Sequence, residues 1–134
     1  MIPILLLLSF CLVCGVAPAW GPGYPDRGWL SHNVYFELND PTDEAIQNLI
    51  DGCWKHLSQI DGVLFFAVGR RAEENDRPVN DGGYHVALHV NFADLDAHDF
   101  YQIDSQHLTF VETFARGWKS VRVFDTVVEG QKSE

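Results

Sequence analysis

The spacing of apolar residues along the chain limits the possible folds more than any other feature of the sequence. In residues 32–38 an apolar side chain stands at every second position, as in a half-buried β-strand. In residues 46–60 apolar side chains recur at helical spacing instead, and later segments follow one pattern or the other. The predicted strands are residues 32–38, 63–68, 84–92 and 119–128, and the predicted helices are residues 40–60, residues 94–101 and a segment that begins near residue 104.

This order of elements predicts an α+β fold, in which a four-stranded antiparallel sheet carries helices on one face. It is the ferredoxin-like β-α-β-β-α-β arrangement. Local signals support the boundaries, because Asp40 and Asp104 can cap helix N-termini and Pro41 suits a first helical turn. The continuous apolar run from Val63 to Val68 indicates a strand that is buried on both faces.

The N-terminal segment, residues 1–19, has the features of a signal peptide. An uncharged apolar run from Ile4 to Val13 is followed by Ala17-Pro18-Ala19, the small-residue pattern of a cleavage site. Cleavage after Ala19 would leave a linker at 20–31, a domain at 32–128 and a tail at 129–134. The protein would then be secreted or periplasmic, with no stable insertion into a membrane. The alternatives are an uncleaved anchor or an apolar helix of the fold.

Charge and cysteine content exclude several classes of function. The net charge is −10 and arises wholly after residue 19, so the domain repels phosphate backbones and is not expected to bind nucleic acid. Cys11 and Cys14 would leave with the signal peptide, and Cys53 would then stand alone on an apolar helical stripe. We therefore expect neither a disulfide framework nor a cysteine metal site, and Cys53 is expected to be a small buried hydrophobe.

The sheet face opposite the helices also carries large apolar side chains. Alternation along the strands places Tyr35 and Phe124 on that face, together with polar residues such as His89. A semi-apolar open face of this size is usually covered by a partner. We therefore expect the chain to form a homodimer through this face.

An ordered set of short motifs runs through the predicted domain. The motifs are His32-x-Val34-x-Phe36, Gly62-Val63, Val68-Gly69-Arg70, Gly83-Tyr84, Phe92, Asp94-Leu95, Tyr101, His107-x-x-Phe110-Val111, Trp118 and Val123-x-Asp125. Taken together and in this order, they resemble the stress-responsive dimeric α/β-barrel (Dabb) family over about residues 32–128. The resemblance implies the fold given above and a dimer in which two sheets pair into a barrel.

The resemblance implies candidate catalytic residues but no single activity. The family includes plant stress proteins and a polyketide cyclase that performs an aldol-type ring closure. In that cyclase a histidine and a tyrosine act on the substrate in a cavity between sheet and helices, and they match His107 and Tyr101 here. The histidine at the start of the first strand matches His32.

This chain departs from the family pattern at two places. It reads Asp104-Ser105-Gln106-His107 where members usually have His-Pro-x-His, so the helix cap is kept while its chemistry changes. Val86 stands where members often have a histidine, and His85 is one residue earlier. An offset of one residue turns a strand side chain to the opposite face, so His85 is not expected in the cavity.

The inward-facing residues predict a small apolar cavity between the helices and the sheet. Its expected lining is His32, Val34, Phe36, Val86, Leu88, Tyr101, His107, Trp118 and Val123. We expect it to bind a hydrophobic or aromatic small molecule. A second hypothesis is a cofactor-independent acid–base enzyme of the cyclase or lyase type, acting on a carbonyl compound through His107 and Tyr101. A third is a structural, stress-protective dimer whose core residues bind no ligand.

No metal or cofactor is expected from the sequence. His85 and His89 share a strand face, but four residues of strand separate them by about 13 Å, too far to chelate one ion. His56 and His98 are interpreted as surface histidines. Asp125 is expected to make structural bonds at the edge of the last strand.

We predict that the mature protein begins near Trp20. N-terminal sequencing of protein recovered from the cell envelope or the medium tests this prediction. An intact Met1 on membrane-bound material would contradict it.

Overall fold

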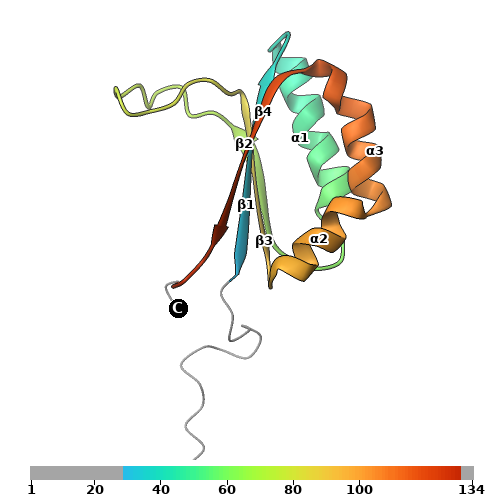
Figure 1. Ribbon diagram of the computed structural model, residues 1–134. Helices are drawn as coiled ribbons and strands as arrows, with labels where there is room; N and C mark the ends of the chain where they lie inside the picture. Colours follow the sequence, from blue (N-terminus) through green and yellow to red (C-terminus); the bar gives the residue numbers. More distant parts are fainter. Residues whose placement is uncertain (1–28, 131–134) are drawn as a thin grey trace, which may run out of the picture.

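The computed structural model describes residues 29–130, which form one sheet with α-helices packed on a single face (Figure 1). The strands are β1 (Leu30–Leu38), β2 (Val63–Arg70), β3 (Val86–Phe92) and β4 (Trp118–Val127). The helices are α1 (Asp43–Leu57), α2 (Leu95–Ile103) and α3 (Ser105–Phe114), with a 3₁₀ turn, η1 (Ala115–Gly117). The strand order is β2-β3-β1-β4, and all neighbours are antiparallel. The predicted ferredoxin-like fold is confirmed.

The start of α1 differs from the prediction. Asp40 does not cap the helix. Thr42 does, because it is the last extended residue before the helix and its Oγ1 accepts a hydrogen bond from the Ala45 amide at 3.1 Å. Pro41 accordingly lies before the cap and not in the first turn. The predicted cap at Asp104 is present, since its Oδ1 accepts a hydrogen bond from the Gln106 amide at 2.8 Å.

The prediction that β2 is buried on both faces is wrong. β2 lies at one edge of the sheet and pairs only with β3. Leu64 and Phe65 are about half exposed, because no helix within residues 29–130 covers the second face of the sheet. The long apolar run therefore reflects a strand that is covered on one side only within this chain.

The core lies between the sheet and the helices, and α1 contributes the largest helical share of its buried residues. The alternating residues Leu30, Val34 and Phe36 of β1 point toward the helices and are buried with the apolar face of α1. Cys53 on that face is fully buried, as expected, and burial raises the pKa of its thiol to about 12. Gly52 allows α3 to approach, because a Cβ at this position would overlap the Phe114 ring. The closeness of α1 and α3 thus depends on a glycine.

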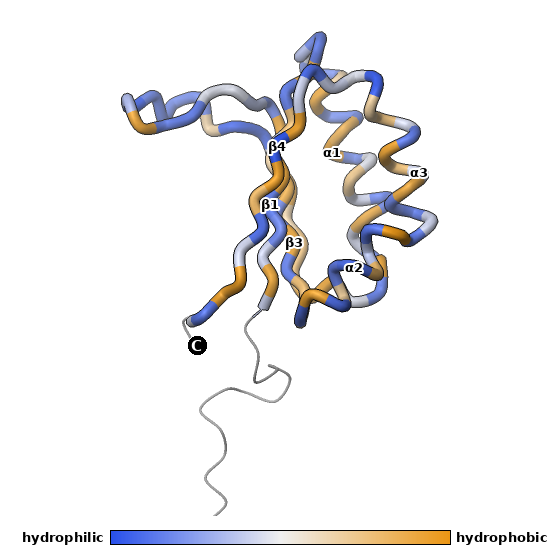
Figure 2. The backbone as a smooth tube through the Cα atoms, viewed as in Figure 1, coloured by the Kyte–Doolittle hydropathy of each residue, from blue (hydrophilic) through white to orange (hydrophobic). Residues whose placement is uncertain are grey.

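The opposite side of the sheet, which we call the outer face, carries Tyr35, His89 and Phe124, as predicted. The ring centroids of Tyr35 lie 5.8 Å from Phe124 and 6.1 Å from His89. The connection between β2 and β3 is largely hydrophilic and projects away from the helices (Figures 1 and 2). The outer face is thus open, with aromatic side chains at its centre.

The predicted signal peptide, Cys11, Cys14 and most of the predicted linker lie outside the described residues. Within residues 29–130, no helix combines the length and apolar character needed to cross a membrane.

Candidate functional site

A pocket of about 370 Å³ lies between the helix-facing side of the sheet and helices α2 and α3. It is lined by His32, Val34, Phe36, Leu57, Leu88, His98, Tyr101, Gln102, His107, Phe110, Val111, Trp118, Val121, Val123 and Asp125. Every residue that the sequence placed around the cavity is among these except Val86. Val86 faces the helices as expected, but it is completely buried in the core, where α1 packs on β3.

The register of the sheet brings His32 and Asp125 together. These residues pair across β1 and β4, and Nδ1 of His32 lies 2.6 Å from Oδ1 of Asp125. Burial lowers the pKa of His32, and the hydrogen bond with Asp125 opposes that shift only in part. The ring is therefore neutral at pH 7. Because a carboxylate only accepts, Nδ1 of His32 donates the bond and Nε2 keeps its lone pair.

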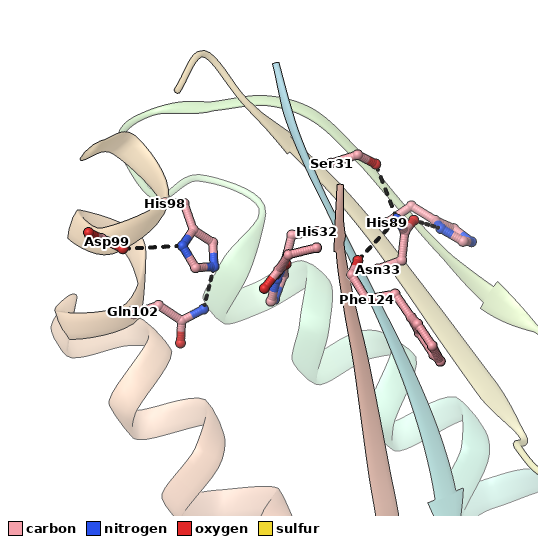
Figure 3. Close-up of polar contacts among 9 residues, drawn as sticks. Ser31, His32, Asn33, His89, His98, Asp99, Gln102 and Phe124 are labelled. Atoms are coloured by element: carbon pink, nitrogen blue, oxygen red, sulfur yellow. Dashed lines mark hydrogen bonds and ion pairs between the residues drawn. The ribbon is translucent and has the colours of Figure 1, made fainter. Parts of the chain in front are cut away.

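His98 is not a surface residue, contrary to the sequence interpretation. Only 12% of its side chain is exposed, because α2 begins at Leu95 and directs His98 and Tyr101 to the same side of the helix. Its ring centroid lies 5.0 Å from that of His32. Figure 3 shows His98 and His32 on facing elements, with Asn33, His89 and Phe124 on the far side of the strands.

His107 and Tyr101 form the second polar group of the pocket. Their ring centroids lie 4.8 Å apart, and Tyr101 lies 6.0 Å from His32 by the same measure. Tyr101 is 1% exposed, and burial raises the pKa of its hydroxyl. The hydroxyl therefore stays protonated and can act as a donor. All three candidate catalytic residues thus lie within one pocket.

Burial decides the charge of His107. The sequence left two opposing effects at this residue, the helix N-terminus and the carboxylate of Asp104. Burial is the largest influence and lowers the pKa of His107, while the Gln102 backbone and Asp104 oppose the change. The ring is therefore neutral near pH 7 and can accept or donate a proton.

Two lining residues have buried polar atoms without partners. Neither Nδ1 of His107 nor Nε1 of Trp118 makes a hydrogen bond of good geometry with any residue in 29–130. The Gln102 backbone raises the pKa of the His107 ring, but it makes no hydrogen bond of good geometry to Nδ1. An unsatisfied buried polar group costs about 1–3 kcal/mol. A bound molecule that offers matching groups would recover that free energy.

His85 lies outside this pocket, as the sequence predicted. Its Nδ1 accepts a hydrogen bond from the Leu38 amide at 3.0 Å. Asp125 does make a bond at the edge strand, but it also lines the pocket, which the sequence did not indicate. The polar lining residues that sequence reasoning missed were therefore His98, Gln102 and Asp125.

Comparison with known proteins places this architecture among described domains. A family model for the Stress responsive A/B Barrel Domain (Dabb) matches residues 30–128. Among functionally curated proteins, none matches the sequence significantly.

Solved structures share the fold. A Dabb family protein with a ferredoxin-like fold from Mesorhizobium loti is 27% identical, with a TM-score of 0.65, and covers 77% of this chain and 99% of its own. A dimeric ferredoxin-like protein from Thermobifida fusca is 19% identical, with a TM-score of 0.64, and the match covers 78% of this chain and 95% of that protein. The hydroxynitrile lyase of Passiflora edulis is 13% identical, with a TM-score of 0.63, and the match covers 79% of this chain and 98% of the lyase. The last two likenesses show the fold alone.

We predict that His107 makes folding pH-dependent. Its pKa in the folded protein lies below the ordinary value of 6.5, so the unfolded chain binds the proton more readily. This contribution to stability is complete above that value and is lost as the pH falls through the folded pKa. The free energy of unfolding, measured in urea between about pH 8 and pH 5, should therefore fall less steeply on acidification in His107→Gln than in the parent. Identical pH profiles would contradict the prediction.

Proposed function

Because the chain belongs to the Dabb family of stress-responsive A/B barrel domains, we propose that it binds a small, mainly apolar molecule in the pocket between α2, α3 and the sheet. The observation that carries this proposal is the pair of unpartnered buried atoms, His107 Nδ1 and Trp118 Nε1, on residues that line a pocket of about 370 Å³. Pockets for small molecules generally begin near about 300 Å³ and combine apolar walls with a few polar groups. This one suits a compact molecule of that kind.

The polar groups restrict the chemistry of the ligand. The indole nitrogen of Trp118 can only donate, so it requires an acceptor such as a carbonyl or phenol oxygen. Tyr101 keeps its hydroxyl proton and can donate as well. Aromatic side chains such as Phe36 and Phe110 supply walls for a flat apolar body. The pocket chemistry thus favours an aromatic molecule that bears an oxygen acceptor.

A second candidate function is acid–base catalysis on a carbonyl compound without a cofactor. The His32–Asp125 hydrogen bond favours it, because it fixes His32 in the tautomer whose Nε2 can accept a proton. In this scheme His107 and Tyr101 exchange protons with the substrate and polarise its carbonyl. The hydroxynitrile lyase of Passiflora edulis is an example of an enzyme on this fold.

The same proposal includes self-association and export. The Thermobifida fusca relative is dimeric, and the outer face of this chain leaves Phe124 53% exposed beside Tyr35. We place the homodimer contact on this face. Export rests on the apolar run at Ile4–Val13 and on Ala17-Pro18-Ala19, which indicate a secreted or periplasmic protein.

A thermal-shift screen of small aromatic aldehydes, ketones and phenols tests the binding proposal. A compound that binds the native state raises the melting midpoint. His107→Gln keeps a hydrogen-bonding group but cannot act as a base, so a binder should retain most of its affinity. An acid–base enzyme should instead lose about 10²–10⁴ in rate, and Tyr101→Phe tests carbonyl polarisation in the same way.

The variant His107→Ala distinguishes a ligand site from an ordinary part of the core. If the pocket is a ligand site, the melting midpoint should change little while binding is lost. A fall in stability of roughly 1–3 kcal/mol, with no ligand found for the parent, would identify the residues as ordinary core. His56→Gln on α1, which lies away from the pocket, is the matched control.

The homodimer is tested by Phe124→Asp. We expect the parent to scatter light as a dimer at micromolar concentration and the variant as a folded monomer, because an unpaired charge in an apolar interface costs several kcal/mol. Phe100→Asp is the control, since Phe100 is 48% exposed on α2 and lies away from the outer face. A folded parent that is monomeric, or an equal effect of both substitutions, would refute the proposed interface.

A further inference from the structure

We infer that His32, His98 and Asp125 form a binding site for one divalent transition-metal ion of the Zn²⁺ type. One nitrogen of each imidazole and one oxygen of the carboxylate all lie within 4.8 Å of one another. The three residues come from β1, α2 and β4, so the fold and not a local motif brings them together. The site does not depend on the organic ligand proposed above.

The donor set matches a transition-metal ion. Two imidazole nitrogens and one carboxylate oxygen are the protein ligands of many catalytic zinc sites, which keep further positions open. The hard ion Mg²⁺ prefers oxygen donors and is poorly suited to two imidazoles. Here the pocket borders all three residues and could hold water or another molecule at the open positions.

The distances require only small adjustments. Zinc holds such ligands at about 2.0–2.2 Å, so neighbouring ligand atoms stand about 3–4 Å apart. The separation of 2.6 Å between His32 Nδ1 and Asp125 Oδ1 would open slightly, and His98 would move closer. The hydrogen bond between His32 and Asp125 would then be exchanged for two bonds to the ion, and the proton on Nδ1 of His32 would move to Nε2, so that the imidazole stays neutral.

The surroundings of His98 favour a metal ligand. Its Nδ1 lies 3.4 Å from Oδ1 of Asp99, and its Nε2 lies 3.1 Å from the side-chain nitrogen of Gln102 (Figure 3). An acceptor at Nδ1 and a donor at Nε2 select the tautomer that carries its lone pair on Nε2. Carboxylates that orient a histidine through its other nitrogen are typical of metal sites. Gln102 would have to turn aside for Nε2 to bind the ion.

Titration of the purified, metal-free protein with ZnCl₂ by calorimetry tests the inference. We expect one ion per chain, and CoCl₂ should produce a visible absorption band that excess MgCl₂ does not abolish. His98→Gln and Asp125→Asn should each weaken Zn²⁺ binding by at least about 100-fold, because removal of a ligand exceeds the effect of removing an orienting neighbour. Both side chains border the pocket and are partly exposed, so each variant is expected to fold.

His56→Gln is the matched control, because it removes a histidine outside the cluster. It should leave the affinity for Zn²⁺ unchanged. Equal affinity in the parent and in either ligand variant, with unchanged melting midpoints, would overturn the inference, as would an equal loss in His56→Gln. If one ligand variant fails to fold, the other decides. No organic compound is present in this experiment, so its outcome is separate from that of the ligand screen.

Discussion

The pairing of β1 with both β3 and β4 is the constraint on which the rest of the structure depends. β1 is a central strand, and its register fixes which side chains face the helices and which face outward. The pairing sets His32 opposite Asp125 on the helix side and Asn33 opposite Phe124 on the outer side. A shift of one residue in β1 would exchange its two faces and turn His32 away from the pocket and from Asp125.

The pocket exists because the helices cover the sheet unevenly. α1 packs on β2 and β3, and α2 packs on β3, but no helix in the described part of the chain packs extensively on β4. Val121 and Val123 on β4 therefore point to the helix side and remain partly exposed. The space above β4 is bordered by α2 and α3, and it opens next to the candidate catalytic residues His32, Tyr101 and His107.

Periodicity predicted the fold and most of the pocket lining, while Tyr101 entered the predicted site through the family resemblance. Alternation along β1 placed His32, Val34 and Phe36 correctly, and helical spacing placed His107 beside Phe110, because both patterns reflect burial on one side of an element. The prediction that Val86 lines the pocket was wrong, because periodicity gives the face of a strand and not what covers that face.

The remaining site residues depend on tertiary contacts that sequence spacing does not contain. Asp125 lies 93 residues from its partner His32, and only the β1–β4 register brings them together. His98 lies on a short helix among Asp96, Asp99 and Gln102 and was interpreted from the sequence as a surface histidine. Its partial burial arises from the packing of α2 on β3, which no local pattern in the helix indicates.

The two faces of the sheet are linked through neighbouring residues on the same strands. Asn33 donates a hydrogen bond to the Phe124 carbonyl at 3.5 Å and contacts Nδ1 of His89 at 2.6 Å on the outer face, while the adjacent His32 and Asp125 contact each other on the helix side. A partner that packs on Phe124 would restrain the backbone on both sides of that residue, and the next residue is Asp125. β4 is an edge strand, and no helix among residues 29–130 packs on it extensively, so such a partner would be the main restraint on the outer face of β4. The proposed dimer contact would therefore hold the carboxylate that orients His32, which makes the outer face part of the support for the pocket.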